Sequence, residues 1–232
     1  MPDESPRDAE KKETKKSAKK RSFLRELPIL IGIALVLSLL IKTFLVQAFF
    51  IPSESMERTL HGCAGCTGDR ILVYKAGYRF HDPKSGDIVV FRAPASWEPE
   101  TRIATPSNPV KRALGWVGGL FGMPQANEKD LVKRVIAVGG QTVQCCDAQG
   151  RVLVDGKPLD EPYVFEDDHK SFAPVKVPAG RLWVMGDHRS DSADSRFHLQ
   201  DGYQGTIPVN SVIGRAFVIV WPPSRWNTLG KG

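Results

Sequence analysis

The chain has 232 residues, a formal net charge of +6 at neutral pH, 41% hydrophobic residues and 25% charged residues. This balance is typical of a folded globular protein, and it excludes a wholly disordered chain and a protein with many membrane spans. Four cysteines are too few for a scaffold held together by disulfides. The positive charge does not require a nucleic-acid partner, because its distribution along the chain has a simpler explanation.

That explanation lies in residues 1–26, which hold nine Lys or Arg and six Asp or Glu side chains, half of the chain's excess charge. This segment has only Phe23 and Leu24 as sizeable hydrophobic residues. It cannot bury enough apolar surface to fold, so we predict a disordered basic tail and no nucleic-acid partner.

A long apolar stretch follows over residues 27–51, in which only Lys42 and Gln47 are strongly polar. Pro28–Ile51 would span about 36 Å as a helix, more than the ~30 Å of a bilayer core, and Lys42 can snorkel to one face. A cleaved signal peptide is disfavoured because the run is too long and no small-residue cleavage pattern follows it. We predict a single transmembrane helix over 27–51 in the cell membrane, with the bilayer as a partner. The basic tail would be cytoplasmic and residues 52–232 extracytoplasmic.

Strand patterns dominate the remainder of the chain, and no segment after residue 60 shows a long helical period. We therefore predict a mostly β domain with an antiparallel sheet over 52–232, interrupted by an irregular, proline-rich insertion over 94–130. Within the insertion, residues 113–123 fit either a loop packed on the domain or a surface that enters the membrane interface. Asp155-Gly156 predicts a tight turn between short strands. The predicted strands are rich in Val and Ile and bounded by Gly, Pro and Asp: ILVYKA (71–76), DIVVFRA (87–93), LVKRVIAVGG (131–140), QTVQC (141–145), RVLVDGKPL (151–159), RLWVMGD (181–187) and VIGRAFVIVW (212–221).

Three elements of this part carry chemistry. Ser55 lies in IPSESMERTL (51–60), directly after the apolar stretch, and a serine needs an activating base to act as a nucleophile. Lys133 and Arg134 alternate within an apolar strand, so they point to opposite faces and one of them points inward. Burial disfavours the charged form of a lysine, and a neutral amine is a competent base. The third element, MGDHRSDSADSR (185–196), is dense in Asp, Ser and Arg and suits a network of internally paired charges.

The motifs PSESM, GDIVVF, KRVIAVGG and GDHRSDSADSR resemble, in order and spacing, the conserved boxes of bacterial type I signal peptidases. The resemblance covers roughly residues 27–222 and includes the membrane anchor. It implies a Ser–Lys catalytic dyad, with Ser55 as the nucleophile and Lys133 as the general base. Ser53 and the Ser55 amide would form the oxyanion hole.

The resemblance also assigns supporting roles within the last motif. Ser192 would orient the lysine, and Asp194 and Arg196 would form a supporting ion pair. Gly186 and Asp187, which begin that motif, look structural.

Some residues depart from the family's pattern. Arg58 replaces a common proline, His188 replaces a common asparagine, and Val138-Gly139-Gly140 replaces a common Pro-Gly-Asp. None of these departures removes a catalytic group.

The implied function is a membrane-anchored serine endopeptidase that removes N-terminal signal peptides from secretory preproteins and needs no cofactor. Three alternatives remain. One is a membrane-anchored β-domain that only binds envelope proteins. Another is a soluble repressor-type Ser–Lys protease, which the apolar span disfavours. The third is a Ser–His–Asp triad that uses His188 beside Asp187.

The four cysteines form two pairs, Cys63 with Cys66 and Cys145 with Cys146. In an extracytoplasmic domain we expect a Cys63–Cys66 disulfide, whereas the state of the second pair stays open. A four-cysteine zinc site is disfavoured because adjacent cysteines are poor tetrahedral ligands, so no metal is predicted.

Overall fold

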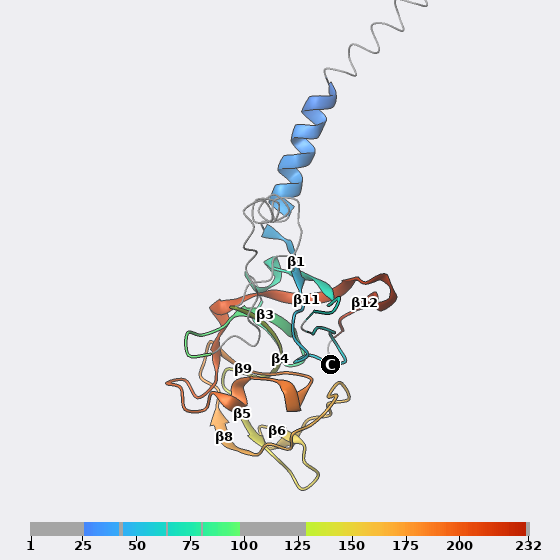
Figure 1. Cartoon of the computed structure of the whole chain (residues 1–232). Coiled ribbons are helices and arrows are strands. Elements are labelled where there is room, and N and C mark those ends of the chain that lie inside the picture. Colours follow the sequence, from blue (N-terminus) through green and yellow to red (C-terminus); the bar gives the residue numbers. More distant parts are fainter. Residues whose placement is uncertain (1–25, 42–43, 64, 80, 98–128, 231–232) are drawn as a thin grey trace, which may run out of the picture. The chain divides into compact units, whose positions relative to one another are not determined.

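The computed structural model describes residues 26–41, 44–63, 65–79, 81–97 and 129–230 (Figure 1). The chain divides into two compact units, Met1–Phe44 and Leu45–Gly232. The prediction of a disordered tail over 1–26 lies almost wholly outside the described residues, and so does that of an irregular insertion over 94–130.

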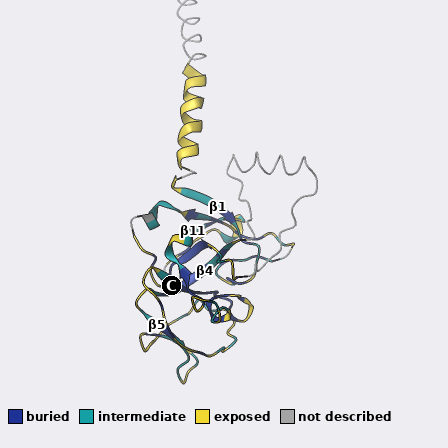
Figure 2. Cartoon of the chain, turned by 90° about the vertical axis from the view of Figure 1, so that its left-hand side faces the viewer, coloured by how far each residue is buried: buried dark blue, intermediate teal, exposed yellow. Residues whose placement is uncertain are grey.

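The first unit contains a helix over residues 26–41. Every residue of this helix is exposed (Figure 2). Large apolar residues such as Ile29 and Leu35 occur around its whole circumference. Among the described residues, no helix meets the length and hydropathy expected of a membrane span.

The prediction of a helix that continues to Ile51 is wrong at its C-terminal end. Val46–Phe50 forms strand β1, which pairs antiparallel with β2 (Arg70–Tyr74). Phe49 and Ile51 are buried in the core of the second unit. Hydropathy alone does not separate a short buried strand from a helix end, and the free edge of β2 supplies hydrogen-bond partners that only a strand can use.

The second unit is built on an eight-stranded sheet in the order β1-β2-β11-β3-β4-β9-β10, with β12 paired to β11. All neighbouring strands of this sheet pair antiparallel, which confirms the predicted antiparallel β class. Its further strands are β3 (Ile88–Arg92), β4 (Asp130–Val138), β9 (Arg181–Met185), β10 (Ile207–Pro208), β11 (Val212–Trp221) and β12 (Asn227–Thr228).

A smaller sheet follows the order β7-β6-β5-β8, with β5 (Thr142–Cys145), β6 (Val152–Val154), β7 (Lys157–Pro158) and β8 (Phe172–Lys176). Asp155 (φ 51°) and Gly156 (φ 75°) both adopt the left-handed conformation between β6 and β7. This confirms the predicted tight turn, which requires positive φ at both positions. The strand β8 is not among the predicted strands because Pro174 interrupts its pattern.

Strand β4 carries both residues of the hydrophobic core and the candidate base Lys133. Leu131 and Val135 belong to one hydrophobic cluster, and Lys133 alternates with them on the same face of the strand. Lys133 and Arg134 point to opposite faces, as predicted, yet both are buried. Two further clusters fill the rest of the domain, and Met56 and Leu60 in one of them anchor the segment that carries Ser55.

Candidate active site

Ser55 and Lys133 meet although 78 residues separate them in the sequence. Nζ of Lys133 lies 2.6 Å from Oγ of Ser55, and the two residues are 0% and 3% exposed respectively. Strand β4 presents Lys133 from the sheet, while Ser55 lies in the irregular segment after β1. The contact has the geometry required of a nucleophile and its base.

Local contacts fix the segment that carries Ser55. The Glu57 amide donates to the Glu54 carbonyl at 3.0 Å, and the Leu60 amide donates to the Met56 carbonyl at 2.8 Å. The buried side chains of Met56 and Leu60 fasten these turns to the core. The segment that carries Ser55 is therefore held in place by the packing of residues that follow Ser55 in the sequence.

Ser53 contributes a second hydroxyl beside the nucleophile candidate. Its Oγ lies 3.3 Å from Oγ of Ser55. A hydroxyl at this distance can donate to a negative charge that develops next to Ser55. The arrangement fits the oxyanion-hole role that the resemblance implies for Ser53.

Gly186 brings the motif at 185–196 against the Ser55 segment. A Cβ atom on Gly186 would collide with Oγ of Ser192 and with the carbonyl oxygen of Ser55. Only glycine allows this close approach of two backbones. Ser192 therefore lies next to Ser55 in space, which fits its expected role at the site.

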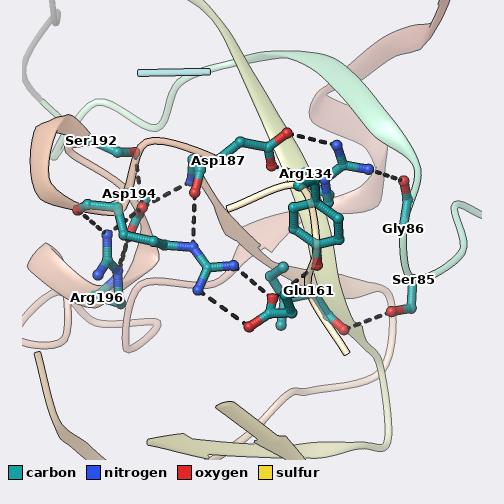
Figure 3. A network of polar contacts seen from close by, with 12 residues as sticks. Ser85, Gly86, Arg134, Glu161, Asp187, Ser192, Asp194 and Arg196 are labelled. Carbon is teal, nitrogen blue, oxygen red and sulfur yellow. Dashed lines mark hydrogen bonds and ion pairs between the residues drawn. The ribbon is translucent and has the colours of Figure 1, made fainter. Parts of the chain in front are cut away.

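Asp194 organises the same motif from a fully buried position (Figure 3). Its carboxylate accepts hydrogen bonds from the Ser192 hydroxyl at 2.8 Å and the Gly186 amide at 3.0 Å. Arg196 donates two further bonds, from Nε at 2.9 Å and from Nη2 at 3.0 Å. The expected Asp194–Arg196 pair is thus present in the structure as a bidentate ion pair.

The charge of Asp194 is set by two opposing effects. Burial raises the pKa of this carboxyl, but the hydrogen bonds and charge of Arg196 outweigh burial and hold the pKa below its usual range. The Gly186 amide and the nearby Lys133 side chain act in the same direction as Arg196. Asp194 is therefore an anion whose charge is neutralised locally.

Replacing Asp194 with asparagine is expected to lower the free energy of unfolding by about 3 kcal/mol, because buried Arg196 loses its bidentate partner and keeps only Asp168 as a counter-charge. The pKa of Asp194 is lower in the folded chain than in the unfolded chain, where it is about 3.9. The ionised carboxylate therefore contributes its full stabilising free energy above about pH 3.9, and this contribution is lost as the pH falls through the pKa of the folded chain. Asp194→Asn should therefore show a shallower loss of stability in acid. Chemical denaturation between pH 3 and 7 measures both effects.

The matched control for this measurement is Asp160→Asn, because Asp160 is exposed. The control should leave stability and its pH dependence close to those of the wild type. Equal losses in the two variants would contradict the structural role of Asp194.

A second buried ion pair, which the sequence analysis did not predict, supports the motif from the other side. Arg134 donates to Asp187 from Nε at 2.8 Å and from Nη2 at 2.6 Å, and the Thr59 hydroxyl reaches the same carboxylate at 2.6 Å. Arg134 also donates to the Gly86 carbonyl at 3.1 Å (Figure 3). The neighbouring buried side chains of Lys133 and Arg134 therefore contact different partners: Lys133 contacts Ser55, and Arg134 pairs with Asp187.

A third pair, also missed, joins Arg189 to Glu161 at 2.6 Å. Arg189 further donates from Nε to the Gly186 carbonyl at 2.9 Å. Glu161 lies 28 residues away from Arg189, so no local pattern pointed to it. Together the three pairs hold the backbone of residues 185–196 rigid around Gly186.

Comparison with known proteins shows which family has this sequence. The sequence model of the family described as signal peptidase, peptidase S26, matches residues 24–221. The chain belongs to this family.

Curated signal peptidases are similar over nearly the whole chain. The probable signal peptidase I of Mycobacterium leprae (strain TN) is 48% identical, and the match covers 92% of this chain and 81% of that protein. The signal peptidase I of Mycobacterium tuberculosis (strain H37Rv) is also 48% identical, and the match covers 90% of this chain and 76% of that protein. That of Leptolyngbya laminosa is 38% identical, over 86% and 81% respectively.

His188, where many signal peptidases have asparagine, does not form a triad with Ser55. One ring nitrogen, Nδ1, lies 3.2 Å from the Glu54 carbonyl, and the other, Nε2, lies 3.0 Å from Oε2 of Glu166. The His188 amide donates to the Ser55 carbonyl at 3.2 Å. Both ring nitrogens thus face groups other than the Ser55 hydroxyl, which argues against the Ser–His–Asp alternative.

Arg58, another departure from the signal peptidase pattern, lies outside the dyad. Its guanidinium stacks 4.4 Å above the ring of Phe165, an arrangement that favours a cation. The Arg58 side chain also lines a surface pocket that Arg134 and Arg225 share. The substitution therefore changes the surface beside the Ser55 segment and leaves the Ser55–Lys133 contact intact.

The cysteines lie in two separate places. Cys63 and Cys66 are joined on the loop between Leu60 and β2, whereas Cys145 and Cys146 are joined at the end of β5 in the smaller sheet. Within the described residues, one cluster could hold a metal ion, namely His61, Cys63 and Cys66. The sequence analysis missed His61 because it considered only the four cysteines as ligands.

Proposed function

We propose that this chain is a signal peptidase I that cleaves secretory preproteins with Ser55 as nucleophile and Lys133 as general base. The proposal rests above all on the 2.6 Å contact between two buried side chains, Oγ of Ser55 and Nζ of Lys133. Membership of the signal peptidase family, with relatives at 48% identity, supports the same reaction. A domain that only binds envelope proteins has no need for this contact.

The reaction begins with attack of the Ser55 hydroxyl on the carbonyl carbon of the scissile peptide. Nζ of Lys133, in contact with the Ser55 hydroxyl, accepts its proton as the general base and then passes it to the leaving amine. Ser53 and the Ser55 amide stabilise the oxyanion that forms. A water molecule activated by Lys133 then hydrolyses the acyl-enzyme.

Asp194 and Arg196 support the dyad through charge. Asp194 lies close enough to Lys133 to interact with it electrostatically. The two hydrogen bonds from Arg196 neutralise Asp194. Ser192, which donates to Asp194 and lies beside Ser55, orients the lysine in this proposal.

The test of the proposed function is cleavage of a purified preprotein by the detergent-solubilised full chain, with the new N-terminus read by mass spectrometry. We expect a single cut after the small residues that end the signal peptide. The matched control substrate carries bulky residues in place of these small ones and should stay intact. No cut in either substrate would favour the binding domain instead, and equal cutting of both would contradict signal-peptide specificity.

The apolar stretch that begins at Leu27 is the membrane anchor in this proposal, with residues 1–26 cytoplasmic and the peptidase domain extracytoplasmic. The helix over 26–41 supports this role, because a helix that is apolar all round and exposed all round needs an apolar surrounding. The basic residues that precede it favour a cytoplasmic N-terminus. The anchor is shorter at its C-terminal end than the sequence predicted, because Val46–Phe50 belongs to the sheet.

Substituting two helix residues with aspartate, Ile33→Asp and Leu37→Asp, is expected to release the protein from membranes. Each charge costs about 2.5–3.5 kcal/mol at the centre of a membrane helix. The matched control, Ile33→Val with Leu37→Val, should stay in the membrane pellet. Extraction of membranes with alkaline carbonate measures the difference, and a wild-type chain found in the supernatant would contradict the anchor.

A further inference from the structure

Three metal-ligating side chains converge on the loop that follows the Ser55 segment. The ligand atoms of His61, Cys63 and Cys66 all lie within 4.8 Å of one another. Nε2 of His61 lies 3.7 Å from Sγ of Cys66. None of the steps proposed for peptide cleavage uses these residues.

The backbone of the loop places the two sulfur atoms on the same side. Gly65 adopts φ +85°, a conformation that only glycine takes readily, and the Cys66 amide donates to the Cys63 carbonyl at 3.5 Å. The two Cα atoms are 5.4 Å apart. A Cys-x2-Cys turn of this kind is the spacing that tetrahedral zinc sites use most often.

Glu57 orients the histidine toward the sulfur atoms. Its Oε1 lies 2.5 Å from Nδ1 of His61. This contact places the proton of the neutral ring on Nδ1 and leaves the lone pair of Nε2 directed at Cys66. In zinc sites, a carboxylate commonly accepts a hydrogen bond from the ring nitrogen of the histidine that does not bind the metal.

The loop is also held in shape before any ion binds. The His61 amide donates to Oδ2 of Asp69 at 2.8 Å, and the Asp69 amide donates back to the His61 carbonyl at 2.7 Å. Arg225 fixes the same Asp69 carboxylate from Nε at 2.8 Å. A site whose ligands sit on a preformed loop needs little ordering when it binds an ion.

We propose that His61, Cys63 and Cys66, with both cysteines as thiols, form a Cys2His site for Zn²⁺ with a water molecule as fourth ligand. Each thiol releases a proton to solvent as its sulfur binds the ion, and Nε2 of His61 donates its lone pair. Two thiolates and an imidazole suit Zn²⁺ and exclude Mg²⁺ and Ca²⁺, which require oxygen ligands. The same two sulfur atoms form the disulfide in this structure. A dithiol reductant must therefore supply two electrons and two protons to the disulfide, and is itself oxidised, before the zinc form can assemble.

The position of this loop gives the ion a structural consequence. A Cβ atom on Gly62 would collide with the carbonyl oxygens of Ile51 and Ser53, so the loop backbone lies directly behind the segment that carries Ser53. Gly68 makes an equally close approach to the Ile51 carbonyl. Zinc at the loop therefore stabilises the folded arrangement around Ser53 and Ser55.

The test is titration of the reduced full chain in detergent with Co²⁺, which gives an absorption band when thiolates bind it, followed by Zn²⁺. We expect one Co²⁺ per chain, displacement by Zn²⁺, and a higher melting temperature with Zn²⁺. Cys63→Ser with Cys66→Ser should abolish the band, and His61→Ala should weaken binding strongly. The matched controls, Cys145→Ser with Cys146→Ser and exposed His81→Ala, should keep it.

A variant that removes no ligand keeps the test decisive if a ligand variant fails to fold. Glu57→Gln should lower Zn²⁺ affinity by about 10–100-fold, because the histidine loses its orienting carboxylate. The proposal is overturned if the reduced wild-type chain binds no Co²⁺ in a one-to-one ratio. It is also overturned if binding survives loss of His61, or follows Cys145 and Cys146 instead.

Discussion

Replacing Ser55 with alanine is expected to lower the rate of preprotein cleavage by about 10⁴-fold or more, since the hydroxyl that attacks the peptide is lost. The side chain is 3% exposed and one atom smaller in the variant, so the fold should tolerate the change. Single-turnover cleavage by the detergent-solubilised variant, followed by mass spectrometry of the products, measures the loss. Thermal unfolding close to that of the wild type shows that the loss is chemical.

Two other serines give this experiment its controls. Ser190→Ala removes an exposed hydroxyl that donates to Glu166 at 3.1 Å, and it should leave cleavage within about 2-fold of wild type. Ser53→Ala removes the proposed oxyanion donor and should cost about 10²–10³-fold. A Ser55→Ala variant that cleaves as fast as wild type would mean that another residue is the nucleophile.

Replacing Lys133 with methionine is expected to lower cleavage by about 10³–10⁴-fold, because the Ser55 hydroxyl loses the base that accepts its proton. Methionine has a similar volume and no charge, so it fills the buried site without leaving a cavity. Cleavage of the same preprotein across a range of pH measures the effect.

The variant Lys133→Arg tests whether residue 133 acts as a base or only supplies a positive charge. Arginine keeps the charge but is never deprotonated in proteins, so this variant should be as inactive as Lys133→Met. Exposed Lys84→Met is the matched control and should keep wild-type activity. Near wild-type turnover in Lys133→Met would refute the dyad, whereas activity in Lys133→Arg alone would indicate an electrostatic role.

The strands of the domain are the part of the fold that the sequence predicts best. Segments such as DIVVFRA and RLWVMGD combine β-branched residues with Gly, Pro and Asp at their ends, and β3 and β9 occupy them. Strand β8 escapes this pattern because Pro174 lies within it. Its partner β5 lies far away in the sequence, and pairing with β5 is what makes the segment a strand.

The apolar stretch at 27–51 shows the limit of hydropathy more clearly. Its composition is nearly uniform, yet residues 26–41 are helical and Val46–Phe50 is a strand. The helix satisfies its own backbone hydrogen bonds, whereas β1 depends on β2, which lies some twenty residues further along the chain. Hydropathy is a property of single residues, so it cannot reveal that β1 will pair with β2 in the folded domain.

The sequence by itself determined the β class, the tight turn at Asp155-Gly156 and, through four motifs in register, the family and its candidate residues. The contact of Lys133 with Ser55 agrees with the dyad that the resemblance implies. Only the tertiary structure decided that Arg134 meets Asp187, Arg189 meets Glu161 and His61 meets the cysteine pair. The physical reason is that strand patterns and turns arise from local backbone preferences and side-chain periodicity. The buried charges are tolerated only beside partners that the sheet brings together from distant positions.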